Sequence, residues 1–395
     1  MKGENIHGII TTPALFPPVK ALDLYDDMDK VRVAIIGIGA ISGIYLENIT
    51  KVFTELELIG VCDLVRERAE QAQEKYGVKK LYENMQEAFS DPEVDIILNL
   101  TRPYEHYEVT RAALLAGKHV YSEKPLGASY EEGKELVSLA REKKLMLGGA
   151  PDTFLGSGIQ TCRRLIDDGF IGEPIGAAAF MICRGHETWH PDPEFYYKYG
   201  GGPMLDMGPY YVTALVNLIG GVKGVTGVTK TSFPQRTITS QPKSGTIVDV
   251  DVPTYVTGIL SFDNGAVGTI FTTFDVHYKQ QARLEIYGTK GTLLVPDPNT
   301  FGGPIQLLRP EEGEYREMPL MYDYKENSRG LGLADMAKAL QTGRDYRACF
   351  SLTQHVLEIL TSFEKSSTEG RYLPLETRYE RTLPMKNNPI HGILD

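Results

Sequence analysis

A glycine-rich segment near the start of the chain has the composition of a phosphate-binding turn. Gly37-Ile38-Gly39-Ala40-Ile41-Ser42-Gly43 follows the apolar run Val31–Ile36 and precedes a helix-forming stretch that ends near Val52. Gly37 permits a tight turn, Gly39 lets the backbone approach a pyrophosphate, and the helix N-terminus offers free N–H groups to it. Ser42 fills the third small position of G-x-G-x-x-G and still permits close packing of helix on strand. The segment predicts a dinucleotide site formed by Gly37, Ile38, Gly39, Ala40 and Ile41.

Asp63 ends the next expected strand, Leu56–Cys62, where a dinucleotide-binding fold carries an acidic residue. Its carboxylate can accept hydrogen bonds from both adenosine ribose hydroxyls and would repel a 2′-phosphate. The expected cofactor is therefore NAD, with NADP as the alternative. Asp63 could instead cap the helix that follows it.

A second segment, His186-Glu187-Thr188-Trp189-His190, spells H-E-x-x-H, which marks a zinc protease when it lies on a regular helix. Pro191 disfavours helical geometry at His190, and the flanking residues have loop composition, so we predict no metal site. A carbohydrate pocket suits this loop better, because it combines flat apolar surfaces with a few polar groups. The candidate substrate contacts are His186, Trp189 and His190, with Tyr196, Tyr197 and Tyr199 as further stacking surfaces. Alternatively, the segment is a well-packed surface loop without a substrate role.

Strands and helices alternate over residues 31–150, which predicts a doubly wound parallel sheet. The expected strands are Val31–Ile36, Leu56–Cys62, Val94–Leu100, His119–Ser122 and Leu145–Leu147. The expected helices between them include Arg66–Tyr76, Glu105–Ala116 and Tyr130–Lys143. Asp152 and Thr153, at the crossing into the next segment, are candidates for substrate contact or for a purely structural role.

After residue 150 the pattern changes to β-rich runs separated by turn signals. Expected strands are Ala177–Cys183, Tyr255–Phe262, Ala266–Phe274, Ala282–Tyr287 and Thr292–Val295, with helices at Gly158–Asp168, Leu333–Gln341 and Leu352–Lys365. We expect an α/β protein with four segments. These are an N-terminal arm (1–30), a Rossmann domain (31–150), an α+β substrate and oligomerisation domain with an open, mainly antiparallel sheet (151–375), and a C-terminal tail (376–395).

Composition limits the classes of partner. The chain has 395 residues, 24% of them charged, and a formal net charge of −11 without a long basic run, so a nucleic-acid partner is not expected. No apolar stretch is long enough to span a bilayer, and residues 1–30 lack the features of a signal peptide. Four scattered cysteines fit reduced thiols. We therefore expect a cytoplasmic protein that does not act at a membrane.

Several further motifs together resemble the Gfo/Idh/MocA family, the glucose–fructose oxidoreductase and inositol dehydrogenase group. Glu123-Lys124-Pro125 follows the strand His119–Ser122, and Ala116-Gly117-Lys118-His119-Val120 leads into it. The other matching segments are Thr101-Arg102-Pro103-Tyr104-Glu105-His106, Gly200-Gly201-Gly202-Pro203-Met204-Leu205-Asp206-Met207-Gly208 and Ile286-Tyr287-Gly288-Thr289-Lys290-Gly291. The resemblance spans about residues 31–375 and implies a substrate pocket between the nicotinamide and the second sheet. It also implies cofactor contacts from Thr101, Arg102, Pro103, His106, Glu123 and Lys124, and a homodimer or homotetramer.

The resemblance also implies the catalytic set Lys124, Asp206 and Tyr210. Many members carry histidine four residues after the motif aspartate; this chain has Tyr210 there, as in the branch that contains glucose–fructose oxidoreductase and dihydrodiol dehydrogenase. A nearby ammonium favours the phenolate, so Lys124 is expected to lower the pKa of Tyr210, while Asp206 orients Lys124 or a substrate hydroxyl. Alternatively, Tyr210 is a core aromatic residue of the next helix, as Tyr211 is expected to be.

Three functions compete. The first is an NAD(P)-dependent oxidoreductase that moves a hydride between the nicotinamide and a secondary hydroxyl of a sugar, glycoside or cyclic polyol, with Lys124 and Tyr210 as the proton-transfer pair. The second is a lyase or glycosidase that oxidises a sugar hydroxyl transiently, with no net cofactor turnover. The third is a nicotinamide-binding sensor without catalysis, against which the intact Lys124, Asp206 and Tyr210 set argues.

Overall fold

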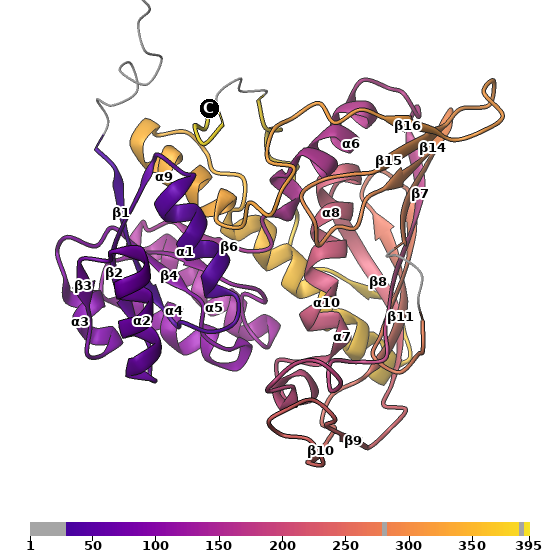
Figure 1. Ribbon diagram of the computed structural model, residues 1–395. Helices are drawn as coiled ribbons and strands as arrows, with labels where there is room; N and C mark the ends of the chain where they lie inside the picture. The colour runs from indigo at the N-terminus through magenta and orange to yellow at the C-terminus, as the bar shows by residue number, and fades with distance from the viewer. Residues whose placement is uncertain (1–28, 279–282, 387–390) are drawn as a thin grey trace, which may run out of the picture.

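The computed structural model describes residues 29–278, 283–386 and 391–395, so most of the expected N-terminal arm lies outside the described residues. Within these ranges the strands form two large sheets that stand apart, joined by helices (Figure 1). This is the predicted α/β architecture. None of the described helices is long and apolar enough to cross a lipid bilayer.

The first sheet is parallel throughout its described strands, in the order β3-β2-β1-β4-β5-β6. Its central strands are buried on both faces, as expected of near-continuous apolar runs such as Val31–Ile36. The strands are β1 Val31–Ile36, β2 Leu56–Cys62, β3 Lys80–Leu81, β4 Ile96–Asn99, β5 His119–Ser122 and β6 Leu147–Gly149.

Helices cover both faces of this sheet. One face packs on α1 Ser42–Lys51, α2 Arg66–Tyr76 and α9 Leu331–Thr342. The other packs on α3 Met85–Ser90, α4 His106–Leu115 and α5 Tyr130–Lys143. Strand β6 begins where Leu145–Leu147 was expected to end, because the Leu145 N–H donates to Ala140 O and the chain is still closing α5 there.

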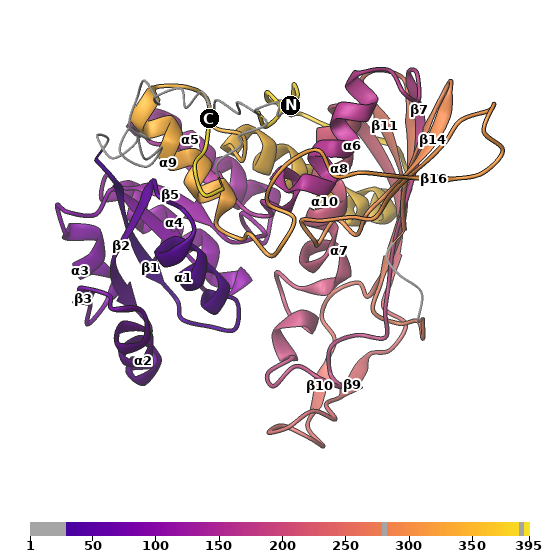
Figure 2. The ribbon, with the colours of Figure 1, turned by 45° about the horizontal axis from the view of Figure 1, so that its top comes forward.

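The second sheet has the order β16-β15-β14-β13-β7-β12-β11-β8-β17, with antiparallel neighbours except for the parallel pair β7 and β12. Its strands are β7 Pro174–Ile182, β8 Val222–Lys230, β11 Tyr255–Phe262, β12 Val267–Thr273, β13 Arg283–Gly288, β14 Gly291–Val295, β15 Ile305–Leu308, β16 Arg316–Met318 and β17 Leu373–Pro374. A small hairpin, β9 Gln235–Thr237 and β10 Ile247–Asp249, projects beyond the sheet (Figure 2).

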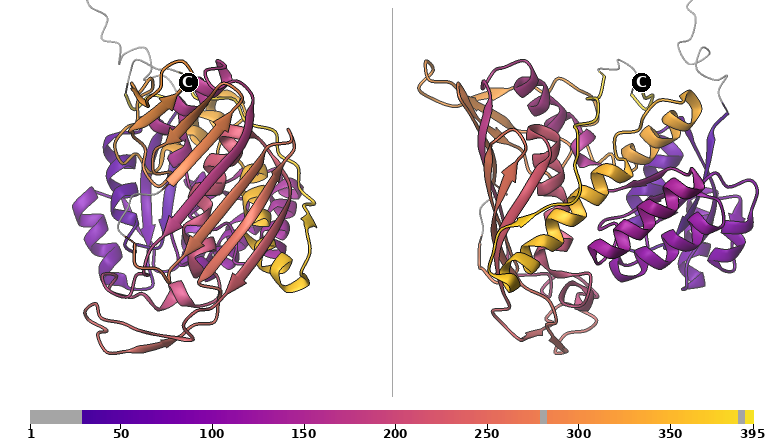
Figure 3. Two further views of the ribbon diagram at one scale, coloured as in Figure 1. Left: turned by 90° about the vertical axis from the view of Figure 1, so that its right-hand side faces the viewer. Right: turned by 180° about the vertical axis from the view of Figure 1, so that it is seen from behind.

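The helices of this half lie on one face of the second sheet, and none of the described helices lies on the other face (Figure 3). They are α6 Ser157–Asp167, α7 Gly202–Asp206, α8 Gly208–Ile219 and α10 Phe350–Glu369, with short 3-10 turns at Thr153–Leu155 (η3) and Glu194–Tyr197 (η4). A further 3-10 turn, η2 Pro103–Glu105, lies in the first half between β4 and α4. Helix α10 contacts both β8 and α5, so it links the two halves. Helix α9 falls within the expected second domain but packs on the first sheet. The expected domain limits at residues 150 and 375 therefore stay a prediction.

Candidate active site

The carboxyl ends of β1, β4 and β5 meet at one edge of the first sheet, beside the point where the strand order reverses. The glycine turn follows β1 there. Gly37 has φ +98°, and a Cβ atom on it would lie 2.8 Å from the carbonyl of Leu100. Gly39 faces open space, and α1 begins without a side-chain cap on its first N–H groups. An open glycine backbone in front of an uncapped helix fits the pyrophosphate of a dinucleotide.

Asp63 lies at the same edge and is half-buried. One carboxylate oxygen accepts the Ile38 N–H at 2.6 Å and the other accepts the Val65 N–H at 2.7 Å. The cap position of α2 is Val65, so Asp63 does not serve as that cap. Each oxygen keeps a lone pair, which leaves the carboxylate able to accept a ribose hydroxyl.

The expected nicotinamide turn after β4 is held together by Asn99. Its Oδ1 accepts the Thr101 hydroxyl at 2.7 Å, and its amide donates to His106 O at 3.1 Å. The His106 side chain is buried, with Nδ1 2.7 Å from Pro125 O, and burial lowers its pKa. Pro103 opens η2. His106 therefore fastens the turn to the Glu123-Lys124-Pro125 segment, while Arg102 reaches out to an ion pair with Asp192.

Glu123 also holds two segments of the site together. Its Oε1 accepts the Tyr45 hydroxyl of α1 at 2.8 Å, and its Oε2 accepts the Lys124 N–H at 3.0 Å. The Glu123 carboxylate thus links helix α1 to the backbone of Lys124, at the edge of the first sheet.

Lys124, Asp206 and His186 meet through one carboxylate. The Lys124 ammonium lies 2.8 Å from Asp206 Oδ1 and 2.6 Å from its backbone oxygen, and His186 Nε2 lies 3.2 Å from Oδ2. All three side chains are 13–14% exposed. The three residues come from the first sheet, from α7 and from the loop after β7, so the cluster bridges the two halves of the chain.

The position of Asp206 depends on the glycine triplet before it. A Cβ atom on Gly201 would lie 2.4 Å from Phe195 O and 2.7 Å from Tyr196 O. Only glycine lets α7 start this close to η4. The loop that carries His186 and the helix that carries Asp206 are thereby held against each other.

Mutual attraction keeps Lys124 and Asp206 charged. Burial would lower the pKa of Lys124, but Asp206, Tyr210 and Glu123 raise it above the usual lysine value. Burial would raise the pKa of Asp206, but Lys124 and His186 lower it below the usual aspartate value. The site therefore presents a fixed ammonium ion and a fixed carboxylate.

Tyr210 lies on α8 within the same cluster, and its ring centroid is 5.3 Å from the Lys124 ammonium. The residue is 7% exposed. Lys124 favours the phenolate, as expected, but burial outweighs it, and the pKa of Tyr210 is raised overall. The expected net lowering was wrong because the effect of burial exceeds that of the nearby ammonium. Tyr211, the neighbouring residue, is buried in the core.

The loop after β7 brings only some of the remaining substrate candidates together beside Asp206. Trp189 is 62% exposed, and its ring lies 5.3 Å from the His186 ring. Tyr196 packs on His186 with ring centroids 4.2 Å apart, and the His190 ring lies 5.3 Å from Tyr196. These four rings form one aromatic wall beside Asp206.

Other candidates in this loop point elsewhere. Tyr197 is buried and donates to Glu187, whose carboxylate also faces Arg236, and Tyr199 donates to Glu132 of α5. The loop is not helical, as Pro191 indicated. Across the described residues, no group of three or more His, Cys, Asp and Glu side chains is placed to hold a metal ion.

Asp152 contacts the segment that leads into α9. Its side chain is buried, and Oδ2 accepts the N–H groups of Gly330 at 2.8 Å and Gly332 at 3.1 Å. Burial raises the pKa of Asp152 to about 6. These contacts hold the start of α9, which fits a structural role for Asp152; a substrate contact from Asp152 stays a prediction. Thr153 begins η3 and is buried too.

One residue of this neighbourhood was not found from the sequence. Arg329, in the loop before α9, carries a positive charge that acts to lower the pKa of Tyr210, against the larger effect of burial. No motif marks it, because its place depends on contacts with segments far away in the chain.

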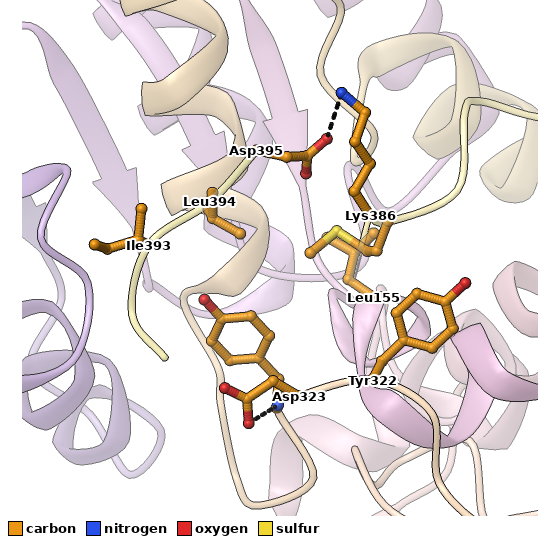
Figure 4. A pocket seen from close by; sticks show the side chains of 9 residues that line it. Leu155, Tyr322, Asp323, Lys386, Ile393, Leu394 and Asp395 are labelled. Carbon is orange, nitrogen blue, oxygen red and sulfur yellow. Dashed lines mark hydrogen bonds and ion pairs between the residues drawn. The ribbon is translucent and has the colours of Figure 1, made fainter. Parts of the chain in front are cut away.

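A separate pocket lies beside the end of the chain (Figure 4). Leu155, Tyr322 and Asp323 line it together with Lys386, Leu394 and Asp395. Lys386 and Asp395 pair across its rim at 3.8 Å. It contains none of the predicted site residues.

Comparison with known proteins places these features in context. A family model described as "Oxidoreductase family, NAD-binding Rossmann fold" matches residues 31–149, and one for the GFO/IDH/MocA C-terminal domain matches residues 159–294. Together they span more than half of the chain.

Similar proteins of known name agree with these matches. Myo-inositol 2-dehydrogenase of Thermotoga maritima is 26% identical over 78% of this chain and 86% of its own length. D-glucoside 3-dehydrogenase of Escherichia coli is 28% identical over 65% of this chain and 74% of its own. The solved structure of levoglucosan dehydrogenase with NADH and L-sorbose superposes with a TM-score of 0.76 at 20% identity, covering 88% of this chain and 99% of that one.

Proposed function

The chain belongs to the Gfo/Idh/MocA family of oxidoreductases with an NAD-binding Rossmann domain, and on that premise we propose that it oxidises a secondary hydroxyl of a sugar, glycoside or cyclic polyol, or reduces the matching ketone. The observation that carries the proposal is the Lys124–Asp206 pair beside Tyr210 at the carboxyl edge of the first sheet. Three dehydrogenases similar to this chain are named for inositols and a glucoside.

In this mechanism NAD, when bound, exchanges a hydride with the reacting carbon. Gly37, Gly39 and the start of α1 would hold the pyrophosphate, and Asp63 would hold the adenosine ribose. Lys124 keeps its charge because of Asp206, so it donates a hydrogen bond to the substrate oxygen and stabilises negative charge there. Tyr210 exchanges the proton: the phenol donates it during reduction, and the phenolate accepts it during oxidation.

The aromatic wall of His186, Trp189, His190 and Tyr196 is proposed to bind the sugar ring. Trp189 offers an exposed flat face, which suits the apolar face of a pyranose or inositol. The Nε2 atom of His186 is occupied by Asp206, so its other ring nitrogen is the one proposed to face a substrate hydroxyl.

The test is formation of NADH from NAD or NADP with a panel of sugars, glycosides and inositols. We expect turnover with NAD, loss of at least about 100-fold in kcat for Lys124→Ala and Tyr210→Phe, and little change for Tyr211→Phe, which removes a neighbouring hydroxyl outside the cluster. Circular dichroism and NADH binding verify that each variant is folded.

Two outcomes would contradict the proposal. Bond cleavage of a glycoside with bound cofactor but no net NADH would indicate a lyase or glycosidase that uses NAD transiently. Cofactor binding with neither turnover nor cleavage, and a biological activity untouched by Lys124→Ala, would indicate a sensor.

We further propose that the helix-free face of the second sheet is covered by another copy of this chain. Val228, Ile259 and Val267 are 64%, 47% and 54% exposed on neighbouring strands of that face. An apolar surface of this kind on a sheet is typical of a subunit interface.

A further inference from the structure

A buried arginine of the β9–β10 hairpin contacts the segments that carry the aromatic wall. Arg236, on β9, is 4% exposed. Its Nη2 atom donates to the backbone oxygen of Arg184, at 3.1 Å, and to that of Phe274. Arg184 follows β7 and Phe274 follows β12, and these two strands are parallel neighbours. One guanidinium therefore joins the hairpin to the carboxyl ends of both strands.

Arg236 also faces two buried carboxylates. Its Nε atom lies 3.4 Å from Glu187 Oε1, and its Nη2 atom lies 3.7 Å from Asp275 Oδ1. Glu187 in turn accepts the hydroxyl of Tyr197, and the guanidinium lies 5.2 Å from the centroid of that ring. Nε and Nη1 of Arg236 form no hydrogen bond among the described residues. The two bonds from Nη2 and the attraction of the two carboxylates thus hold the guanidinium in place.

Glu187 is the acidic residue of the H-E-x-x-H segment, and the hairpin binds that segment at two points. The backbone oxygen of Glu187 accepts the Thr239 N–H at 2.9 Å and the Ser240 N–H at 3.0 Å. The Ser240 hydroxyl donates to the backbone oxygen of His190 at 2.5 Å. The carboxylate of this motif therefore serves to attach the loop to the hairpin.

Phe274 connects Arg236 to the rest of the aromatic wall. Its backbone oxygen accepts from Arg236, while its ring lies 4.7 Å from the His186 ring and 6.3 Å from the Tyr196 ring, centroid to centroid. Two of the four wall residues thus pack on a residue that Arg236 holds. The other two belong to the H-E-x-x-H segment that the hairpin binds.

We propose that Arg236 is a positioning residue for substrate binding, which holds the aromatic wall in place beside Asp206. It acts through Glu187 and Phe274 and does not itself touch the substrate. The inference rests on the proposed function, in which this wall binds the sugar ring. A guanidinium suits the role better than an ammonium, because its planar fork can donate to two carbonyl oxygens while it faces a carboxylate.

Steady-state kinetics of polyol oxidation test the role of Arg236. Arg236→Met keeps the length of the side chain but removes its charge and donors. The KM for the polyol is expected to rise about tenfold or more while kcat stays within about threefold, and the Kd for NADH should not change. Arg236→Lys keeps the charge without the fork and should give an intermediate KM. A KM within twofold of the wild type in either folded variant would overturn the proposal.

The matched control is Arg163→Met. Arg163 is 5% exposed and donates to Asn217 Oδ1 of α8 at 2.9 Å, so it is an equally buried arginine of the second half. Its loss should lower the melting temperature, as the loss of Arg236 should, but leave the KM unchanged. Should Arg236→Met not fold, Arg236→Lys and Glu187→Gln decide: the glutamine can still accept the Tyr197 hydroxyl but lacks the charge, and its KM should rise too.

A second readout does not depend on turnover. Trp189 is the single tryptophan of the chain, and its ring lies 5.3 Å from that of His186 and 5.4 Å from that of His190. Its fluorescence anisotropy, measured on the full chain saturated with NAD, should fall in Arg236→Met and stay unchanged in Arg163→Met. If the wild type oxidises no polyol, the proposed function fails. The anisotropy alone then decides on Arg236, and an unchanged value would overturn its role.

Discussion

At the scale of single residues, the site depends on one carboxylate whose two oxygens bind different partners. Asp206 gives Oδ1 to Lys124 and Oδ2 to His186. A buried charge removed from such a network leaves its partner uncompensated, which costs more than the pair contributes. Asp206 therefore sets both the charge of Lys124 and the position of the aromatic wall.

Asp206→Asn tests this division. The amide keeps the shape but not the charge, so burial is expected to lower the pKa of Lys124, the reverse of its present shift. Activity should fall by about 100-fold or more, and the remaining activity should decline as pH rises through the lowered lysine pKa. Asp251→Asn, which loses an exposed pair with Lys198, serves as control. Activity within twofold of the wild type would contradict the role of Asp206.

The raised pKa of Asp152 predicts how the stability of the chain changes with pH. Its pKa of about 6 in the folded chain exceeds the ordinary value near 4 in the unfolded chain. Between about pH 4 and 6 the folded chain keeps a proton that the unfolded chain has released, so stability falls as pH rises. Asp152→Asn can still accept both glycine N–H groups but does not ionise.

The free energy of unfolding is measured by denaturant titration at pH 4 and at pH 7. From pH 4 to pH 7 the free energy of unfolding of the wild type is expected to fall by about 1–3 kcal/mol relative to that of Asp152→Asn. A difference that stays constant, or that grows in the opposite direction, would contradict a buried and costly carboxylate at this position.

At the scale of elements, Asp192 joins the substrate loop to both neighbours. It pairs with Arg102 after β4 and, at 2.7 Å, with Lys243 of the β9–β10 hairpin. Asp192→Ala releases both contacts and should loosen the aromatic wall without touching Lys124 or Tyr210. The KM for substrate is expected to rise several-fold while kcat stays within about twofold.

The matched control for that variant is Glu194→Ala, since Glu194 pairs with Lys243 at 3.2 Å and with no other basic side chain among the described residues. It should leave the KM nearly unchanged. Equal KM values in wild type and Asp192→Ala would show that the ion pairs do not hold the loop in its binding position.

Elements with a strong local pattern were predictable, and those defined by distant partners were not. The apolar runs of β1, β2 and β5 and the glycine turn were read from the sequence at nearly their observed bounds. Strand β8 was missed because Gly224 and Gly227 weaken its strand pattern. A Cβ atom on Gly227 would lie 2.6 Å from Phe363 O of α10, and one on Gly224 would lie 2.7 Å from Leu373 O. Both glycines are therefore required by segments that come much later in the chain.

The site divides in the same way. Lys124, Asp206 and Tyr210 stood in a family motif, and the structure brings them together. The structural role of Asp152 and the presence of Arg329 follow from contacts between segments far apart in the sequence, for which a single sequence gives no signal. The net pKa of Tyr210 was misjudged because burial depends on the whole fold.

At the scale of the whole molecule, the helix-free face of the second sheet predicts the assembly. Ile259→Lys places a charge among the exposed apolar side chains of that face and is expected to reduce the mass in solution to that of a single chain. Ile247→Lys, on the exposed hairpin strand β10, is the matched control. Sedimentation analysis that gives the same mass for wild type and Ile259→Lys would contradict an interface there.

Helix α9 has a consequence for how the chain acquires its shape during synthesis. Its buried residues Leu331, Met336 and Ala337 complete the core beneath the first sheet. The strands of that sheet all precede residue 150, so they leave the ribosome long before the helix that covers them. Until α9 emerges, one flank of the nucleotide-binding half exposes apolar surface, and a nascent chain truncated before residue 331 should be held by chaperones rather than bind NAD.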